Sequence, residues 1–275
     1  MKDNAIISRA SELARESEYS VTCTCFLTPE EKISVLTELM HNGEGGNCYF
    51  FGGAIGCERC AAVFLPEWYA PDTQINHNLP LDEERTNFFA QYLAEHHEIA
   101  EQLPLRVIRV KGSGFRKLAH RDFMGGILSL GIDRSVIGDI AVVSESEAII
   151  FVQERILSYI LSELNKIGND GVKTEEIPLN STYVIPRSYE ITDAVVASMR
   201  LDAVVKAITG KSREIASEMV REGIVTHCYQ INCDVSSPVR EGDIISIKGY
   251  GKYLIGENGN QTKSGRLKVK IKKYI

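Results

Sequence analysis

Long apolar runs are missing from this 275-residue sequence. No stretch approaches the roughly 20 consecutive apolar residues that a membrane-spanning helix needs, although hydrophobic residues make up an ordinary 44% of the chain. The first 18 residues, MKDNAIISRASELARESE, are amphipathic and charged, and they lack the apolar core of a signal peptide. We therefore expect a cytoplasmic protein with no membrane partner.

The cysteines are unevenly spaced. The seven cysteines are an odd number without a regular pattern, which predicts reduced thiols rather than a disulfide framework. Cys57 and Cys60 have the C-x-x-C spacing of many zinc ligands, but the earlier pair, Cys23 and Cys25, is C-x-C, and Cys48 stands alone. The sequence predicts no metal site and no cofactor, with zinc at these cysteines as the alternative.

Two catalytic motifs are incomplete. Gly210-Lys211-Ser212 resembles the end of the phosphate-binding loop of nucleotide hydrolases, but the glycine required five positions earlier is Val205. His120-Arg121-Asp122 resembles a kinase catalytic loop, yet the asparagine expected five residues after the aspartate is Ile127. We predict neither enzyme class and no catalytic residue.

Positive charge is in short supply overall, but it is unevenly divided. The whole chain has 31 lysines and arginines against 37 aspartates and glutamates. Residues 200–275 hold 14 basic and 8 acidic side chains, whereas residues 1–199 hold 17 basic and 29 acidic ones. A basic segment that follows an acidic one is typical of a protein that binds a polyanion such as RNA. A solvated face with chance clustering is the alternative.

Turn-forming and proline-containing stretches divide the sequence into three domains and a linker. Residues 1–80 predict an N-terminal α+β domain, in which residues 28–31 (TPEE) have the capping-box pattern of a helix start. Residues 82–178 predict the order βαββαβ, a ferredoxin-like plan that RNA-recognition motifs (RRMs) share. Residues 179–198 are predicted to be a linker before a third domain, residues 199–275. The predicted fold class is therefore α+β.

RNA-recognition motifs stack bases on aromatic residues of the sheet, and such aromatics are scarce here. Phe151 is the one aromatic on a predicted central strand of the middle domain. We predict that Phe151 is a core residue rather than part of a stacking platform.

The third domain places cations on a short helix. Residues 213–222 predict a helix with Ser212 as its N-cap. Arg213, Ser217 and Arg221 are four positions apart, so they share one face. We expect this face to point outward, where guanidinium groups can contact successive RNA phosphates. Solvated surface arginines are the alternative.

A second basic pattern lies on the last predicted strand, GRLKVKIKKYI, where every second residue is a cation. Stacked like charges favour a bound counter-anion, and lysines that protect an edge strand are the alternative. The glycine-rich turn KGYGK adds two more cations. The residues predicted to contact RNA are Arg200, Lys211, Ser212, Arg213, Ser217, Arg221, Lys248, Lys252, Arg266, Lys268 and Lys270, with His120 and Arg121 as a secondary contact at a helix start.

Five short motifs give residues 199–252 a family resemblance. They are Arg200-Leu201-Asp202, Ser212-Arg213, Gly223-Ile224-Val225, Asn232 and Glu241-Gly242-Asp243. Together they resemble the small RNA-binding domain named after small-subunit ribosomal protein four, the S-four domain. The stretch THCYQINC departs from that pattern, because the family has a shorter and more basic turn there.

Two further stretches extend the resemblance over nearly the whole chain. AHRDFMGGILSLGIDRSVIGDI and FFGGAIGCERCAAVFLP are similar to regions of the YlmH family of bacterial S-four proteins. This resemblance implies a non-enzymatic RNA-binding protein in ribosome-associated quality control. The partners it implies are ribosomal RNA and tRNA on the large ribosomal subunit that carries a stalled chain, together with other quality-control factors.

Two other functions remain as alternatives. An RNA-modifying enzyme of the pseudouridine synthase type is one, because S-four domains occur in such enzymes and Arg200-Leu201-Asp202 resembles part of their catalytic motif. A cell-division scaffold is the other, because the resemblance also implies a genetic link to division.

Overall fold

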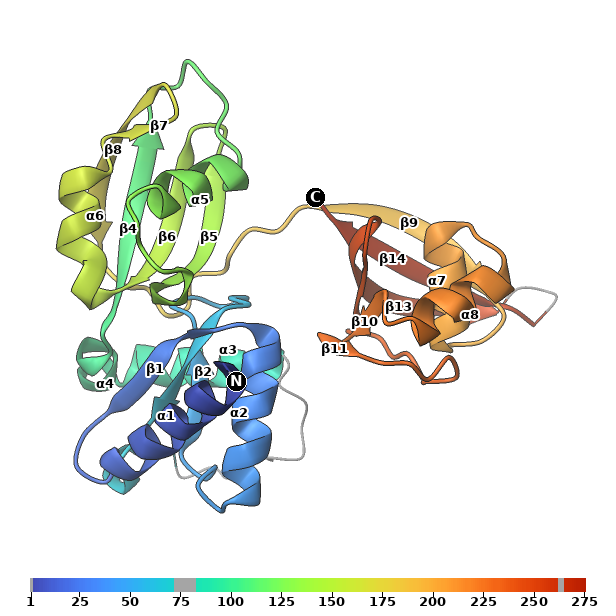
Figure 1. Ribbon diagram of the computed structural model, residues 1–275, viewed down its shortest axis with the longest axis horizontal. Helices are drawn as coiled ribbons and strands as arrows, with labels where there is room; N and C mark the ends of the chain where they lie inside the picture. Colours follow the sequence, from blue (N-terminus) through green and yellow to red (C-terminus); the bar gives the residue numbers. More distant parts are fainter. Residues whose placement is uncertain (1, 72–82, 262–264) are drawn as a thin grey trace. The chain divides into compact units, whose positions relative to one another are not determined.

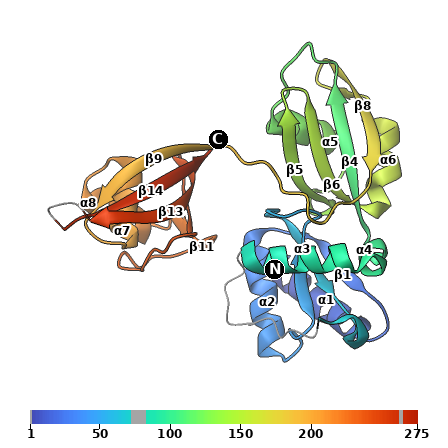
Figure 2. The ribbon, with the colours of Figure 1, turned by 180° about the vertical axis from the view of Figure 1, so that it is seen from behind.

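The computed structural model describes residues 2–71, 83–261 and 265–275 in two compact units, the N-terminal unit (Met1–Pro186) and the C-terminal unit (Arg187–Ile275). Both units combine helices with antiparallel sheets (Figures 1 and 2), so the predicted α+β class is confirmed at that level. None of the described helices is long and apolar enough to cross a bilayer. The domain boundary predicted near residues 80–82 lies outside the described residues.

The N-terminal unit begins with a three-stranded sheet in the order β1-β3-β2. Its elements are α1 (Lys2–Glu16), β1 (Thr22–Leu27), α2 (Pro29–His41), β2 (Cys48–Phe51), β3 (Cys60–Phe64), α3 (Glu83–Glu95) and α4 (His97–Gln102). The capping box predicted for α2 is confirmed, because Glu31 N donates to Thr28 Oγ1 over 3.2 Å and Thr28 N donates to Glu31 Oε2 over 2.7 Å.

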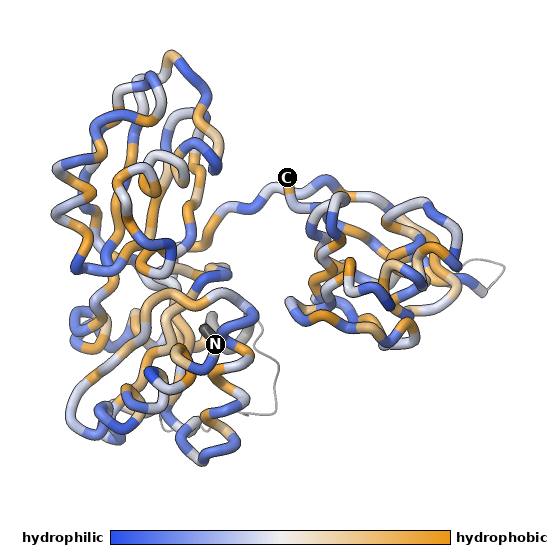
Figure 3. Tube along the Cα trace, in the orientation of Figure 1, coloured by the Kyte–Doolittle hydropathy of each residue, from blue (hydrophilic) through white to orange (hydrophobic). Residues whose placement is uncertain are grey.

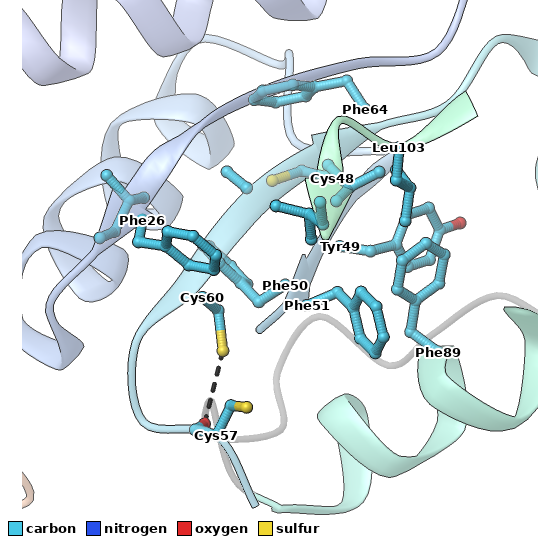
Figure 4. Packing of buried hydrophobic residues seen from close by; sticks show 14 of the residues in the cluster. Phe26, Cys48, Tyr49, Phe50, Phe51, Cys57, Cys60, Phe64, Phe89 and Leu103 are labelled. Atoms are coloured by element: carbon cyan, nitrogen blue, oxygen red, sulfur yellow. Dashed lines mark hydrogen bonds between the residues drawn. The ribbon is translucent and has the colours of Figure 1, made fainter. Parts of the chain in front are cut away.

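Both faces of this sheet are covered, α1 and α2 lying on one face and α3 on the other (Figures 1 and 2). Every residue of β2 and β3 is therefore buried. Tyr49 of β2 stacks on Phe89 of α3 with ring centroids 4.7 Å apart. Figure 4 shows this aromatic core, and Figure 3 shows apolar residues concentrated along these strands.

The same unit continues with a five-stranded antiparallel sheet in the order β5-β6-β4-β8-β7. Its elements are β4 (Leu105–Gly112), α5 (His120–Leu128), β5 (Ile137–Ser144), β6 (Glu147–Gln153), α6 (Leu157–Glu163), β7 (Lys166–Ile167) and β8 (Asp170–Ile177). Helices α5 and α6 lie on one face of this sheet, and Figure 2 shows its other face.

Phe151 of β6 lies where the two sheets of the N-terminal unit meet. Its side chain is 2% exposed and belongs to the core of the first sheet, so the prediction that it is a core residue is confirmed. Gly53 lies directly against its ring, because a Cβ at that position would come within 2.3 Å of Phe151 Cδ1. Gly53 also has φ +103°, a conformation that favours glycine.

The C-terminal unit is a six-stranded antiparallel sheet in the order β11-β10-β12-β13-β14-β9. Its elements are β9 (Tyr189–Val196), α7 (Leu201–Thr209), α8 (Arg213–Arg221), β10 (Val225–His227), β11 (Gln230–Ile231), β12 (Ile244–Ile247), β13 (Gly251–Gln261) and β14 (Leu267–Tyr274). The two helices cover one face of the sheet (Figure 1) and contribute Val205, Ala216 and Val220 to a core that includes Val269 and Ile271 of β14.

Strand β9 falls within the stretch predicted to be a linker. It pairs with β14 along its whole length, from Val196↔Leu267 to Tyr189↔Tyr274. Residues 189–196 are thus part of the C-terminal sheet rather than a linker. Because β14 lies between β13 and β9, it is an interior strand, and the interpretation of its lysines as edge protection is wrong.

Candidate nucleic-acid interface

A buried aspartate joins the starts of the two helices in the C-terminal unit. Asp202 lies in the first turn of α7 and is 2% exposed. Its Oδ1 accepts a hydrogen bond from Arg200 Nε and its Oδ2 accepts one from Arg213 Nε, both over 3.1 Å. Arg213 is the first residue of α8, so these bonds tie the two helix starts together. We call Arg200, Asp202 and Arg213 the arginine clamp.

The clamp is ionised and keeps a net positive charge. Burial raises the pKa of Asp202, but the hydrogen bonds and charges of Arg200 and Arg213 outweigh it and hold that pKa below its usual value. The two arginine side chains remain 39% and 61% exposed, and their η nitrogens make no hydrogen bond to the part of the chain that the structure describes. These η nitrogens are therefore oriented donors available to a phosphate.

The turn between α7 and α8 brings further polar groups next to the clamp. Gly210 ends α7 with φ +68°, which suits glycine. Ser212 caps α8 as predicted, because its Oγ accepts a hydrogen bond from Ile215 N over 3.3 Å. Lys211 is exposed. A lysine and an arginine thus flank the N-terminus of a nine-residue helix, whose first-turn amides attract anions.

The arginine face predicted for α8 was expected to point outward, and it departs from that expectation at Arg213, the first residue of the helix. Arg221, in the last turn, is exposed, and Ser217 is half-buried. Arg213 does not simply point outward, because its Nε is bonded to buried Asp202. An aspartate in the first turn of a helix is common, so the sequence contained no signal for this bond.

The predicted cations of β14 occupy the sheet face opposite the helices. Lys268 and Lys270 are exposed, whereas Val269 and Ile271 are 1% and 4% exposed, so the predicted alternation is confirmed. Lys270 lies opposite Asp193 of β9, which offsets part of the positive charge on this face.

Three other predicted cations lie around the rim of this sheet. Lys248 and Arg266 are exposed, in the turn after β12 and just before β14. Lys252 Nζ lies 4.7 Å from the ring centroid of Tyr229 and 4.8 Å from that of Tyr274, and it donates a hydrogen bond to Tyr229 Oη over 3.2 Å. The charge of Lys252 is therefore already engaged within the unit.

His120 and Arg121, the predicted secondary contact, begin α5 in the N-terminal unit. Arg121 is exposed. Partial burial, followed by the charge of Arg134, lowers the pKa of His120, against an opposing effect of Asp139. An acid caps this helix start, because Asp122 Oδ2 accepts a hydrogen bond from the backbone N of residue 119 over 2.8 Å.

Two stretches of the YlmH resemblance meet between the sheets of the N-terminal unit. Asp139 accepts hydrogen bonds from the backbone N of Glu58 over 2.6 Å and of Arg59 over 3.3 Å. Arg59 also donates to Ile137 O over 3.1 Å and to Phe26 O over 2.9 Å. These bonds connect the two sheets, and the sequence alone did not identify them because the partners lie about 80 positions apart.

Two groups of side chains could be considered as metal ligands, the cysteines of the N-terminal unit and a cluster around His227. Cys60 Sγ donates to Cys57 O over 3.4 Å (Figure 4), and burial raises the pKa of both thiols, which disfavours the thiolates that zinc binds. Among the described residues, His227, Cys228 and Asp243 offer ligand atoms within 4.8 Å of one another. His227 and Asp243 instead form an ion pair of 2.7 Å, and we assign them no metal.

Comparison with known proteins finds similarity to YlmH and to a quality control protein. Residues 100–181 match the model of the family described as "Putative RNA-binding domain in YlmH". The chain is 27% identical over 269 residues, 97% of its length and 93% of the other's, to a ribosome-associated protein quality control protein of Bacillus subtilis (strain 168). The structure of cell division protein ylmH from Streptococcus pneumoniae aligns with a TM-score of 0.46 and 19% identity, covering 66% of this chain and 95% of that one. The predicted similarity to YlmH is thus confirmed, and the segment that matches the family model, residues 100–181, holds β4 to β8.

Proposed function

We propose that this chain is a non-enzymatic protein that binds structured RNA on the ribosome. The observation that carries the proposal is the arginine clamp, in which a buried carboxylate orients two guanidinium groups whose η nitrogens remain available. The match to a YlmH RNA-binding domain and the name of the B. subtilis relative support it independently. Phosphate recognition by oriented arginines needs no nucleophile, metal or cofactor.

The proposal includes the architecture of both units. The order β5-β6-β4-β8 with α5 and α6 on one face supports a ferredoxin-like fold for the middle domain. Helices α7 and α8 with the strands that follow them support an S-four-type RNA-binding module in the C-terminal unit. In this arrangement the predicted site residues of α7, α8 and the turn between them form the primary RNA contact.

The biological setting follows from the family. The large ribosomal subunit with ribosomal RNA and tRNA is the proposed target, and rescue of stalled chains in ribosome-associated quality control is the proposed process. The protein would act in the cytoplasm together with other quality-control factors. RNA incubated with the protein should show no new modification by mass analysis, and uridine isomerisation would instead favour the pseudouridine synthase alternative.

The first prediction tests the clamp in the full chain. Arg213→Ala should weaken binding to a structured ribosomal RNA fragment about 10- to 150-fold, because a charge-assisted contact contributes roughly 1.5–3 kcal/mol. It should also lower the free energy of unfolding by about 1–2 kcal/mol, because buried Asp202 loses one of its partners. The measurements are RNA affinity over a salt series and thermal unfolding.

Two further variants, Lys211→Ala and Arg9→Ala, separate the effect on RNA binding from the effect on folding. Lys211→Ala removes an exposed cation without touching Asp202, so it should reduce the log–log salt slope by about one unit at unchanged stability. Arg9→Ala removes the same charge from α1, where Arg9 pairs with Glu12, and should leave RNA affinity unchanged. An RNA affinity that does not depend on salt would refute the phosphate-contact model.

A further inference from the structure

The loop between β4 and α5 is the green loop that joins them in Figure 1. It carries Phe115, an aromatic residue that is 99% exposed. Residues 105–121 around it contain no aspartate or glutamate, although the unit as a whole has 27 acidic and 16 basic side chains. The lysines and arginines in this stretch are Arg106, Arg109, Lys111, Arg116, Lys117 and Arg121.

The loop is held in place on both sides of Phe115. Asp170, which is 6% exposed, accepts hydrogen bonds from both Ser113 N, over 3.2 Å, and Ser113 Oγ. Phe115 N donates to Ser113 Oγ over 3.3 Å. On the other side, Leu118 is 3% exposed and its N donates to Glu145 O over 2.7 Å. The backbone is thus anchored while the ring projects into solvent, which reduces the entropy lost when a ligand binds.

Two glycines make this loop shape accessible. A Cβ at Gly112 would lie 2.7 Å from Asp170 Oδ2 and 2.9 Å from Leu118 Cδ1, so a side chain there would displace both anchors. Gly114 has φ +86°, in the region that favours glycine. The chain therefore adopts a defined turn whose outermost side chain is an aromatic ring.

The cations beside Phe115 are only partly neutralised. Arg116 pairs with Asp122 over 3.6 Å, and Lys117 pairs with Glu145. Lys111 and Arg121 are exposed and have no ion pair with any residue that the structure describes. Lys111, near the end of β4, and Arg121, at the start of α5, therefore lie on either side of the loop as cations available to a phosphate.

This combination fits an unpaired nucleotide better than a protein surface. An apolar protein partner would need a continuous apolar patch, but the loop neighbours of Phe115 are Ser113, Gly114, Arg116 and Lys117. A single ring among cations matches one nucleotide, whose base stacks on the ring while its phosphates meet the cations. We propose that the β4–α5 loop binds an unpaired nucleotide of RNA, with Phe115 as the stacking residue and Lys111 and Arg121 as phosphate contacts.

The inference rests on the proposed RNA-binding function and adds a second contact, in the N-terminal unit, to the arginine clamp. Phe115 was not among the residues predicted from the sequence, because a lone aromatic in a loop has no periodic signal. Arg121 was predicted as a secondary RNA contact. The loop adds Phe115, a stacking residue, to that predicted contact.

The test uses the full chain and two RNA probes, a hairpin with an unpaired uridine loop and a fully paired duplex of the same length. Phe115→Ala should weaken binding to the hairpin about 5- to 150-fold and leave duplex binding unchanged, because one stacked base is lost. Phe115→Trp should retain hairpin affinity, since the larger ring also stacks. A fluorescent 2-aminopurine in the loop should be quenched by the wild-type protein and not by Phe115→Ala.

The controls separate stacking from exposure and from charge. Tyr19→Ala removes another highly exposed ring, which lies beside Glu18, and should leave hairpin affinity unchanged. Lys111→Ala should weaken both probes equally and reduce their salt dependence, as expected for phosphate contacts. All variants should keep the wild-type melting temperature because the altered side chains are exposed.

The outcomes distinguish this inference from the proposed function. If the wild-type protein binds neither probe, the RNA-binding function itself fails. If the wild-type protein binds RNA and Phe115→Ala binds the hairpin equally well, the loop is not an RNA contact and the inference is overturned. If Phe115→Ala lost affinity equally for the hairpin and the duplex, the inference would also be overturned, because stacking requires an unpaired base.

Discussion

At the scale of single residues, a substitution in the arginine clamp can separate the effect of charge on RNA binding from the effect of arginine orientation. Asp202→Asn makes the C-terminal unit more positive, so charge alone would strengthen RNA binding. We expect weaker RNA binding instead, because the neutral amide no longer holds Arg200 and Arg213 in place, and a stability loss of about 1–3 kcal/mol. Affinity and melting temperature measured on the same sample check this, and tighter binding would show that orientation is irrelevant.

His227 and Asp243 give the C-terminal unit a pH-dependent stability. The hydrogen bond to Asp243, then that to Cys228, raises the pKa of His227 to about 9. Burial raises the pKa of Asp243, but the His227 hydrogen bond outweighs it and lowers that pKa. Because the folded state binds the His227 proton more tightly than the unfolded state, the stabilisation is complete below about pH 6.5 and is lost as the pH rises through about 9.

The corresponding experiment compares the wild-type protein with His227→Gln across that window. The free energy of unfolding of the wild type should fall by about 3 kcal/mol between about pH 6 and about pH 10, since each pKa unit is worth about 1.4 kcal/mol. The variant should show a much smaller fall. Equal pH profiles for the two proteins would mean that the ion pair does not contribute to stability.

Residue patterns predicted the local features well and the long-range ones poorly. Thr28 and Ser212 were predictable because a cap and its partners lie within three residues of each other. The clamp bond from Arg213 to Asp202 spans 11 positions, and the bonds from Arg59 to Phe26 and Ile137 span 33 and 78. Such contacts depend on how the elements pack, and no periodicity of a single sequence encodes them.

At the scale of secondary-structure elements, β9 was the main element that the sequence analysis missed. Its apolar residues fall on both faces, Val196 being 2% exposed and Ile191 and Val195 60% and 50% exposed, so it lacks the clean alternation of a half-buried strand. The helices α7 and α8 were predictable because their buried residues follow helical spacing.

This strand determines where the C-terminal unit can be separated from the chain. A fragment of residues 187–275 should fold, whereas a fragment of residues 199–275 should melt at a clearly lower temperature and aggregate, because β14 would become an exposed edge. Thermal unfolding and light scattering of the two fragments provide the measurement. Equal stability of the two fragments would mean that β9 is dispensable.

At the scale of the whole molecule, the two units carry net charges of opposite sign. The C-terminal unit has 15 basic and 10 acidic side chains, and the N-terminal unit has 16 basic and 27 acidic ones. We expect the acidic unit to oppose non-specific attraction to polyanions. The 187–275 fragment should therefore elute from heparin at higher salt than the full chain, and elution at the same salt would contradict this role.

The pairing of β9 with β14 also constrains how the protein is made. β9 leaves the ribosome before α7 and α8, but its partner strand is translated only after β13. Such a pairing between distant segments raises the contact order and slows folding. A nascent chain that stops before β14 would leave β9 without a partner strand and β13 with one open edge, so the basic unit can complete its sheet only once synthesis has passed Tyr274.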